Sequence, residues 1–142
     1  MKILLAIDGS RHSLRAVERL IEHADWYREI PQVELVNVHL PVPRLPRMNV
    51  VVGASQIRRY YDKEGNAALA KARKLLDRNG IRYSARLLVG PVAETLIKHA
   101  KLTRCDLIMI GTRGLTAAGN LLLGSTANKL AHLSPVPLLL VK

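Results

Sequence analysis

The chain has 142 residues, of which 49% are hydrophobic and 23% charged, a balance typical of one globular domain and unlike that of disordered or fibrous chains. Lys and Arg number 22 against 11 Asp and Glu, and the resulting net charge of +11 raises the local concentration of anions such as nucleotides, nucleic acids and anionic lipids. The single cysteine, Cys105, excludes an intramolecular disulfide, so we expect one cytoplasmic domain over residues 1–142.

The beginning of the chain predicts a strand followed by a helix. The apolar run Ile3–Ile7 is too short to span a membrane and is typical of a buried strand. A helix is expected to begin near Ser10, an N-cap residue, and to end before Pro31. Apolar residues recur there at helical spacing: Leu14, Val17, Leu20, Ile21 and Ala24. Trp26 and Tyr27, near the end of this helix, are interpreted as packing residues.

The middle of the chain predicts two strands separated by a loop and a helix. A strand rich in β-branched residues covers Val33–Leu40, and the prolines of Pro41–Gly53 indicate a loop. A long helix is expected over Tyr60–Arg78, ending at Asn79-Gly80, which suits a left-handed C-terminal cap. Ile81–Val89 predicts a third strand.

The last third predicts two helices and two strands. Gly90-Pro91 opens a helix with proline at its first position, and Leu107–Ile110 is a short apolar strand of the kind buried on both faces of a parallel sheet. Ser125–Leu133 predicts a helix with Ala127, Leu130 and Ala131 on one side, and Leu138–Val141 the last strand. Five strands alternating with four helices, without a hairpin signal, predict right-handed crossovers and a three-layer α/β sandwich with a parallel sheet.

Glycines gather where the fourth predicted strand ends. Gly111-Thr112-Arg113-Gly114 is followed, after nine residues, by Gly124-Ser125-Thr126 at a predicted helix start. Ligands of open parallel sheets bind at the carboxyl ends of strands, glycines allow close backbone approach, and a helix N-terminus suits phosphate. Arg113 could add charge, and Ser125 and Thr126 add hydroxyls. The simpler alternative is a turn at Gly111 and Gly114 followed by an N-cap at Ser125.

The motif is not a Walker loop, because Asn120-Leu121 stands where that loop needs Lys and Ser or Thr. Gly-x-x-Gly, nine residues and Gly-Ser resembles the signature of ATP-binding universal stress proteins, and Gly111, Gly114, Gly124 and Ser125 match it. The similarity covers nearly the whole chain. It implies an adenine nucleotide α-hydrolase-like fold with strand order 3-2-1-4-5.

The resemblance also implies ligands and site residues. Asp8 would contact the nucleoside, and the backbone of Val38 would meet the adenine; the alternatives are a turn aspartate and an ordinary strand valine. The remaining site residues would surround the ribose and phosphates: Gly111, Arg113, Gly114, Gly124, Ser125 and Thr126. Mg²⁺ would bridge the phosphate oxygens of ATP. An apolar edge strand needs cover, so we expect a homodimer through Val136–Val141, as in the resembling family.

Two other functions remain open. An enzyme of the related adenine-nucleotide α-hydrolase type would need an S-G-G-x-D-S loop, which Asp8-Gly9-Ser10-Arg11 lacks. A charge-driven nucleic-acid-binding module fits the net charge, but the basic residues are dispersed and phenylalanine is absent. No catalytic base stands out, so at most slow ATP hydrolysis or autophosphorylation is expected. No metal-ligand spacing is found among the five histidines. Whether Arg44 or Arg47 of the basic Pro41–Gly53 loop reaches the phosphates is left open.

Overall fold

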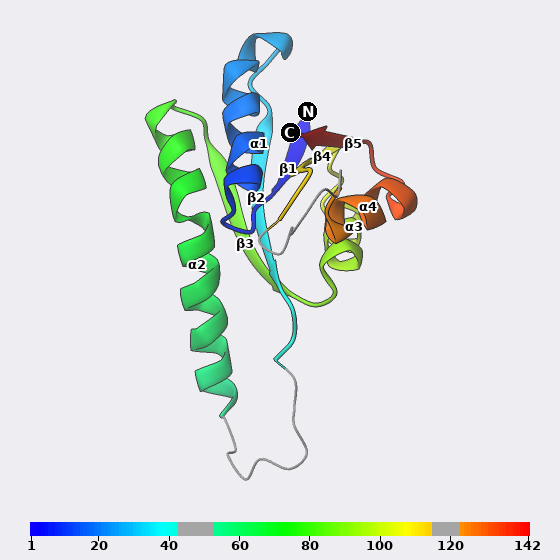
Figure 1. Ribbon diagram of the computed structural model, residues 1–142. Helices are drawn as coiled ribbons and strands as arrows, with labels where there is room; N and C mark the ends of the chain where they lie inside the picture. The colour runs from blue at the N-terminus through cyan, green and yellow to red at the C-terminus, as the bar shows by residue number, and fades with distance from the viewer. Residues whose placement is uncertain (43–52, 115–122) are drawn as a thin grey trace.

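The computed structural model describes residues 1–42, 53–114 and 123–142. In this part of the chain, five parallel strands form one sheet in the order β3-β2-β1-β4-β5, as the sequence predicted (Figure 1). The strands are β1 (Lys2–Ala6), β2 (Gln32–His39), β3 (Tyr83–Val89), β4 (Leu107–Gly111) and β5 (Leu138–Val141). The two edges of the sheet are therefore β3 and β5.

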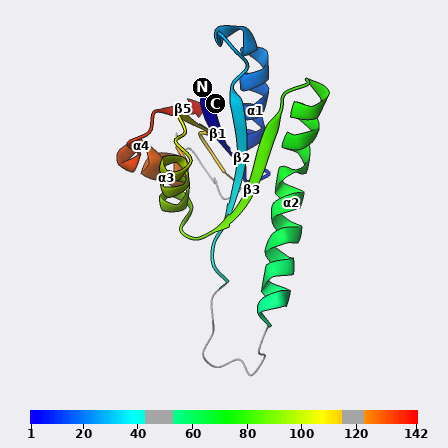
Figure 2. The ribbon, with the colours of Figure 1, turned by 180° about the vertical axis from the view of Figure 1, so that it is seen from behind.

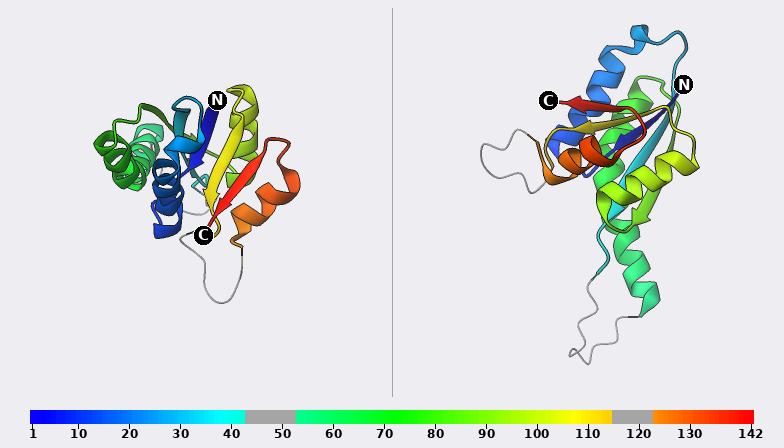
Figure 3. Two further views of the ribbon diagram at one scale, coloured as in Figure 1. Left: turned by 90° about the horizontal axis from the view of Figure 1, so that it is seen from above. Right: turned by 90° about the vertical axis from the view of Figure 1, so that its right-hand side faces the viewer.

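Helices cover both faces of the sheet (Figures 2 and 3). The helices α1 (Arg11–Glu22) and α2 (Ala54–Arg78) lie on one face, and α3 (Val92–Leu102) and α4 (Ser125–Leu133) lie on the other. This arrangement confirms the predicted three-layer sandwich. Across residues 1–42, 53–114 and 123–142, no helix has the length and apolarity needed to cross a membrane.

Alternate residues of β1, the central strand, pack into two hydrophobic cores on the two faces of the sheet. Ile3 and Leu5 pack in the core beneath α1 and α2, whereas Leu4 and Ala6 pack in the core beneath α3 and α4. Successive side chains of a strand point to opposite faces, so a strand covered on both sides is apolar at nearly every position. This requirement explains the uninterrupted apolar runs of β1 and β4.

The first helix is shorter than predicted. It begins after the N-cap Ser10, whose side chain accepts a hydrogen bond from the N–H of Ser13, but it ends at Glu22 and is followed by a short 3-10 turn, η1 (Ala24–Trp26). A helix of this length rises about 18 Å, which matches the length of the strand that it covers. Trp26 is 72% exposed and stacks on His23, so its predicted packing role is wrong, whereas Tyr27 packs against the core.

The second helix is longer than predicted at its N-terminal end. It begins at Ala54 instead of Tyr60, and the side-chain oxygen of Gln56 accepts a hydrogen bond from the N–H of Gly53. Its first buried residue is Gly65, because the early turns extend past the sheet (Figure 3) and leave no apolar pattern to read. Its other end follows the prediction, with Gly80 at a φ of +65° in the left-handed region.

Smaller differences occur elsewhere in the chain. Strand β3 begins at Tyr83, because Ile81 instead bonds back to the carbonyl of Leu76 and closes the end of α2. Pro91 is the N-cap of α3 and not its first residue, and Ala131 is exposed. Strand β4 extends to Gly111, which pairs with Val141. Cys105 is a buried core residue.

Candidate functional site

The predicted site residues follow three neighbouring strands. Asp8 lies just beyond β1, Val38 lies near the end of β2, and Gly111 is the last residue of β4. Because β1 stands between β2 and β4, the carboxyl ends of these strands meet at the point where the strand order reverses. The sheet topology therefore brings the three segments of the candidate site together at the carboxyl ends of the strands.

A backbone contact joins the two halves of the glycine motif. The N–H of Gly124 donates a 2.7 Å hydrogen bond to the carbonyl of Thr112, whose own N–H donates to the carbonyl of Val141 at 2.8 Å. Thr112 is buried, and sequence reasoning gave it no role, because these contacts are made by its backbone. The start of α4 is thus held beside the end of β4, while residues 115–122 lie outside the described residues.

Among the described residues, no side chain caps the backbone N–H groups at the start of α4. Gly124 is the N-cap and has no side chain, so it leaves the first N–H groups of the helix without a side-chain acceptor. Its φ of −69° and ψ of 160° are open to any residue. Among the described residues, a Cβ at Gly124 would come no closer than 3.5 Å to its neighbours. Neither backbone conformation nor packing with these residues therefore requires glycine here.

At Gly111 and Gly114, in contrast, a Cβ would lie too close to a neighbouring residue. A Cβ at Gly111 would collide with the backbone carbonyl of His12, because the first turn of α1 packs directly on the end of β4. A Cβ at Gly114 would lie 2.8 Å from Oδ2 of Asp8. Gly111 therefore permits close packing inside the fold, whereas Gly114 brings the loop backbone beside the carboxylate of Asp8.

Asp8 combines both roles considered for it. Its Oδ1 accepts a 2.9 Å hydrogen bond from the N–H of Ser10, as a turn aspartate does. Its own N–H donates to Oγ of Ser13 at 3.4 Å. The side chain is half-buried and reaches Gly114, so turn formation does not remove the carboxylate from the candidate site.

The backbone of Val38 faces the site. The carbonyl of Val36 accepts the N–H of Ile7 on the β1 side, and the carbonyl of His39 accepts the N–H of Gly90 on the β3 side. Backbone groups of a strand alternate between its two sides, so those of Val38 point the same way as those of Val36. Since the pairing of β1 with β2 ends at Val36, these groups of Val38 lie beyond the last β1–β2 pair.

The remaining predicted residues lie at the two ends of the glycine motif. Arg113 and Thr126 are half-buried and Ser125 is exposed. Arg44 and Arg47 lie outside the described residues, and so does most of the basic Pro41–Gly53 loop. Within residues 1–42, 53–114 and 123–142, no three His, Cys, Asp or Glu side chains gather as a metal site would require.

A charge cluster that sequence reasoning missed lies nearer the other end of β2. The side chain of Glu34 is 3% exposed, yet Nζ of Lys2 lies 3.2 Å from its Oε2, and Nε2 of His99 lies 3.3 Å from its Oε1. Arg86 adds a third basic group at 3.6 Å. Burial acts to raise the pKa of Glu34, but Lys2 and His99 outweigh it, and the pKa lies below its ordinary value. The alternation of side chains along β2 could have predicted which face of the sheet Glu34 points to. It could not have predicted that His99 of α3 lies beside it.

The order of the strands and the helices on both faces of the sheet define an α/β protein with an adenine nucleotide α-hydrolase-like fold. The model of the Universal stress protein family matches residues 1–142. A universal stress protein of Methanocaldococcus jannaschii is 31% identical over 142 residues, covering 99% of this chain and 81% of that protein. One of Thermus aquaticus is 33% identical over 145 residues, covering 99% and 97%. The chain belongs to the universal stress protein family, as the glycine motif predicted.

Structural comparison agrees with this assignment. The crystal structure of a universal stress protein in complex with cAMP matches with a TM-score of 0.71 at 25% sequence identity, covering 100% of this chain and 97% of that chain. The two chains therefore share the whole fold.

Proposed function

We propose that this protein binds ATP at the edge formed by the ends of β1, β2 and β4. The observation that carries the proposal is the start of α4, where Gly124 provides no capping side chain and a backbone hydrogen bond holds the helix against Thr112. Unpaired N–H groups and the positive end of the helix dipole favour phosphate oxygens. The similar protein that was solved with cAMP supports an adenine nucleotide as the ligand.

The nucleoside would bind between Asp8 and Val38. The backbone N–H and C=O of Val38 point into the space beyond β1 and can pair with the polar edge of adenine. The carboxylate of Asp8 can accept hydrogen bonds from ribose hydroxyls. Arg113, Gly111 and Gly114 would lie beside the ribose and phosphates, and Ser125 and Thr126 would add hydroxyl donors at the helix start.

Mg²⁺ would accompany the nucleotide and neutralise part of the phosphate charge. The carboxylate of Asp8 lies beside the backbone of Gly114. The described residues hold no cluster of three metal-ligating side chains. The ion would therefore take most of its ligands from phosphate oxygens and water, as Mg²⁺ commonly does.

The biological role that we propose is a cytoplasmic stress-response or signalling module, formed by one domain over residues 1–142. Nucleotide occupancy would be the signal, with at most slow hydrolysis or autophosphorylation.

We also propose a homodimer through Val136–Val141. Strand β5 is at the sheet edge, pairs with β4 alone among the described strands, and exposes 41% of Leu139. Pairing with a second copy would cover this edge. Light scattering at micromolar concentration should give twice the monomer mass, and a Leu139→Lys variant should shift the mass toward one chain. A monomeric mass for the unsubstituted protein would remove the proposal.

The ATP proposal is tested on the purified protein. Acid extraction followed by chromatography should release an adenine nucleotide, and calorimetry on stripped protein should measure saturable ATP binding that strengthens with Mg²⁺. GTP serves as the control, since the backbone of Val38 would meet a different base edge. Absence of ATP binding to folded, stripped protein would contradict the proposal.

A further inference from the structure

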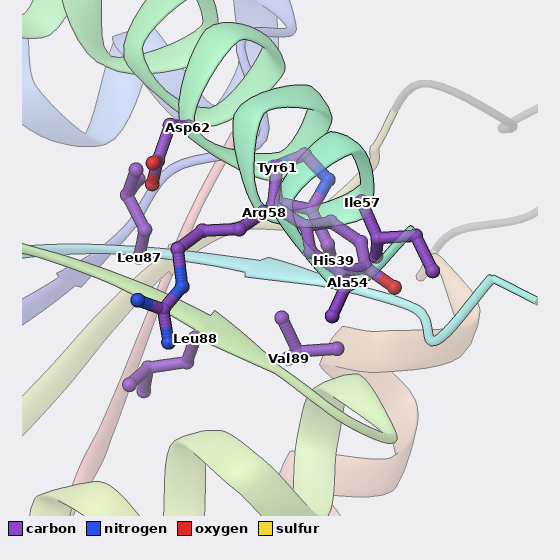
Figure 4. Close-up of a pocket in the computed structure, with 9 residues that line it drawn as sticks. All are labelled: His39, Ala54, Ile57, Arg58, Tyr61, Asp62, Leu87, Leu88 and Val89. Atoms are coloured by element: carbon purple, nitrogen blue, oxygen red, sulfur yellow. The ribbon is translucent and has the colours of Figure 1, made fainter. Parts of the chain in front are cut away.

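A hollow lies on the far side of β2 from the proposed nucleotide site. It is a cleft of about 340 Å³ between the first turns of α2 and the carboxyl ends of β2 and β3 (Figure 4). The described residues that line it are His39, Ala54, Ile57, Arg58, Tyr61, Asp62, Leu87, Leu88 and Val89. None of them belongs to the proposed nucleotide site. The volume suits one small molecule.

Most of the cleft wall is apolar. Leu87 and Val89 line it from the edge strand β3, and Ile57 lines it from α2. Val89 is 47% exposed, which is high for an aliphatic side chain at the end of a strand. A ligand with an aliphatic part would bury this surface.

Two opposite charges line the same cleft. Arg58 and Asp62 are one turn apart on α2, and Figure 4 shows both side chains at one end of the cleft, away from Ala54 and Ile57. Residues at this spacing commonly pair with each other. Among the described residues, however, neither side chain takes part in an ion pair.

The back of the cleft is held in place without a ligand. The hydroxyl oxygen of Tyr61 accepts a 2.7 Å hydrogen bond from the N–H of Val42, and the ring of Tyr61 lies 5.5 Å from that of His39. The other side of the His39 ring packs under Gly65, where a Cβ would lie 3.1 Å from Nε2. A preformed wall reduces the conformational entropy that the protein loses when a ligand binds.

We propose that this cleft binds a free α-amino acid with an aliphatic side chain. The guanidinium of Arg58 would hold the carboxylate, Asp62 would hold the ammonium group, and the side chain would pack on Leu87 and Val89. A simple carboxylic acid would leave Asp62 beside a second anion, and a simple amine would leave Arg58 unpaired. A zwitterion satisfies both charges, and the planar guanidinium fork suits a carboxylate.

Calorimetry and chemical-shift titration with L-leucine test the proposal on the full chain. Leucine should bind, whereas N-acetyl-leucine, which lacks the ammonium group, and leucinamide, which lacks the carboxylate, should each bind at least about tenfold more weakly. Serine should also bind more weakly, because it does not bury the aliphatic surface. Failure of leucine to bind, or equal binding of all four compounds, would overturn the proposal.

Variants then locate the site. Arg58→Met and Asp62→Asn should each weaken leucine binding by about tenfold or more. Arg59→Met, which removes a neighbouring charge that does not line the cleft, should leave it unchanged. ATP affinity should stay the same in all three variants, so this test is independent of the proposed nucleotide site. Leucine binding that survives both Arg58→Met and Asp62→Asn would place it elsewhere and overturn the proposal.

Discussion

The N–H of Gly124 lies 2.7 Å from the carbonyl oxygen of Thr112, to which it donates a hydrogen bond. This contact ties the beginning of α4 to the end of β4, so the N-terminus of the helix keeps a set position relative to the sheet. A phosphate bound there would meet donors already in place, and little reordering of the helix start would be needed.

The first prediction concerns Gly124 as a ligand contact. Gly124→Val should weaken ATP binding by at least about tenfold, because its side chain would stand where phosphates approach the helix. The free energy of unfolding should change by less than about 1 kcal/mol, since the described neighbours leave room for a Cβ. Gly114→Val should also weaken binding, through Asp8. Gly53→Ala, at an open position, is the control, and unchanged ATP affinity in both valine variants would contradict the assignment.

The second prediction separates Gly111 from Gly124. Gly111→Ala should lower the free energy of unfolding by about 2–3 kcal/mol, because the added Cβ meets the backbone of His12 and not a movable side chain. Urea denaturation measures the loss, again with Gly53→Ala as the control. If Gly111→Ala were as stable as the unsubstituted protein, α1 would not pack against β4 as closely as described.

The third prediction concerns Gly65 inside α2. Alanine in a helix normally stabilises by about 1 kcal/mol relative to glycine. At Gly65, however, a Cβ would lie 2.5 Å from Cδ2 of Leu87 and 3.1 Å from Nε2 of His39. Gly65→Ala should therefore destabilise the protein by about 1–2 kcal/mol.

The matched variant is Ala67→Gly, at an exposed position of the same helix. Its measured cost gives the intrinsic helix preference without a change in packing. Equal and opposite effects of the two substitutions would show that Gly65 makes no close contact.

The fourth prediction concerns the pH dependence that Glu34 contributes. Because its pKa is lower in the folded protein than in the unfolded chain, its ionisation stabilises the fold above the unfolded value of about 4.3. That stabilisation is lost as the pH falls through the folded pKa. Glu34→Gln should therefore cost about 1–3 kcal/mol near neutral pH and progressively less in acid.

Chemical denaturation between about pH 7 and pH 3 measures this difference. Glu29→Gln, an exposed substitution, is the control and should give a difference that is small at every pH. A cost of Glu34→Gln that stayed constant across this range would show that the carboxyl has the same pKa in both states.

Much of the fold was predictable because strands buried on two faces have recognisable apolar runs and helix ends have recognisable cap residues. The apolar runs of β1 and β4 have no polar residue because both of their faces are covered, and Ser10 and Gly80 are cap residues whose chemistry acts within one turn. The early turns of α2 were missed because they bury almost nothing against the sheet. The end of α1 at Glu22 was missed because no breaker residue marks it in the sequence.

The sequence predicted that the segments of the candidate site follow neighbouring strands, but it did not predict their contacts. Gly124 and Gly111 look alike in the sequence, yet a Cβ at Gly124 would make only ordinary contacts with the described residues, whereas one at Gly111 would collide with the carbonyl of His12. Thr112 holds Gly124 through its backbone carbonyl, and no residue type reveals such a contact. The cleft beneath α2 left no signal, because its walls come from three separate segments of the chain, at His39, in the first turns of α2 and at the end of β3.

By itself, the sequence determined the alternation of strands and helices, the place of the glycine motif after β4, and membership of the family. Those properties depend on local periodicity and on residues that lack a Cβ. Only the tertiary structure decided that the backbone of Val38 faces past the end of β1, that Glu34 is enclosed by three basic groups, and that Arg58 and Asp62 line one cleft. Strand length, register and helix packing set these relationships, and they arise from the whole sheet at once.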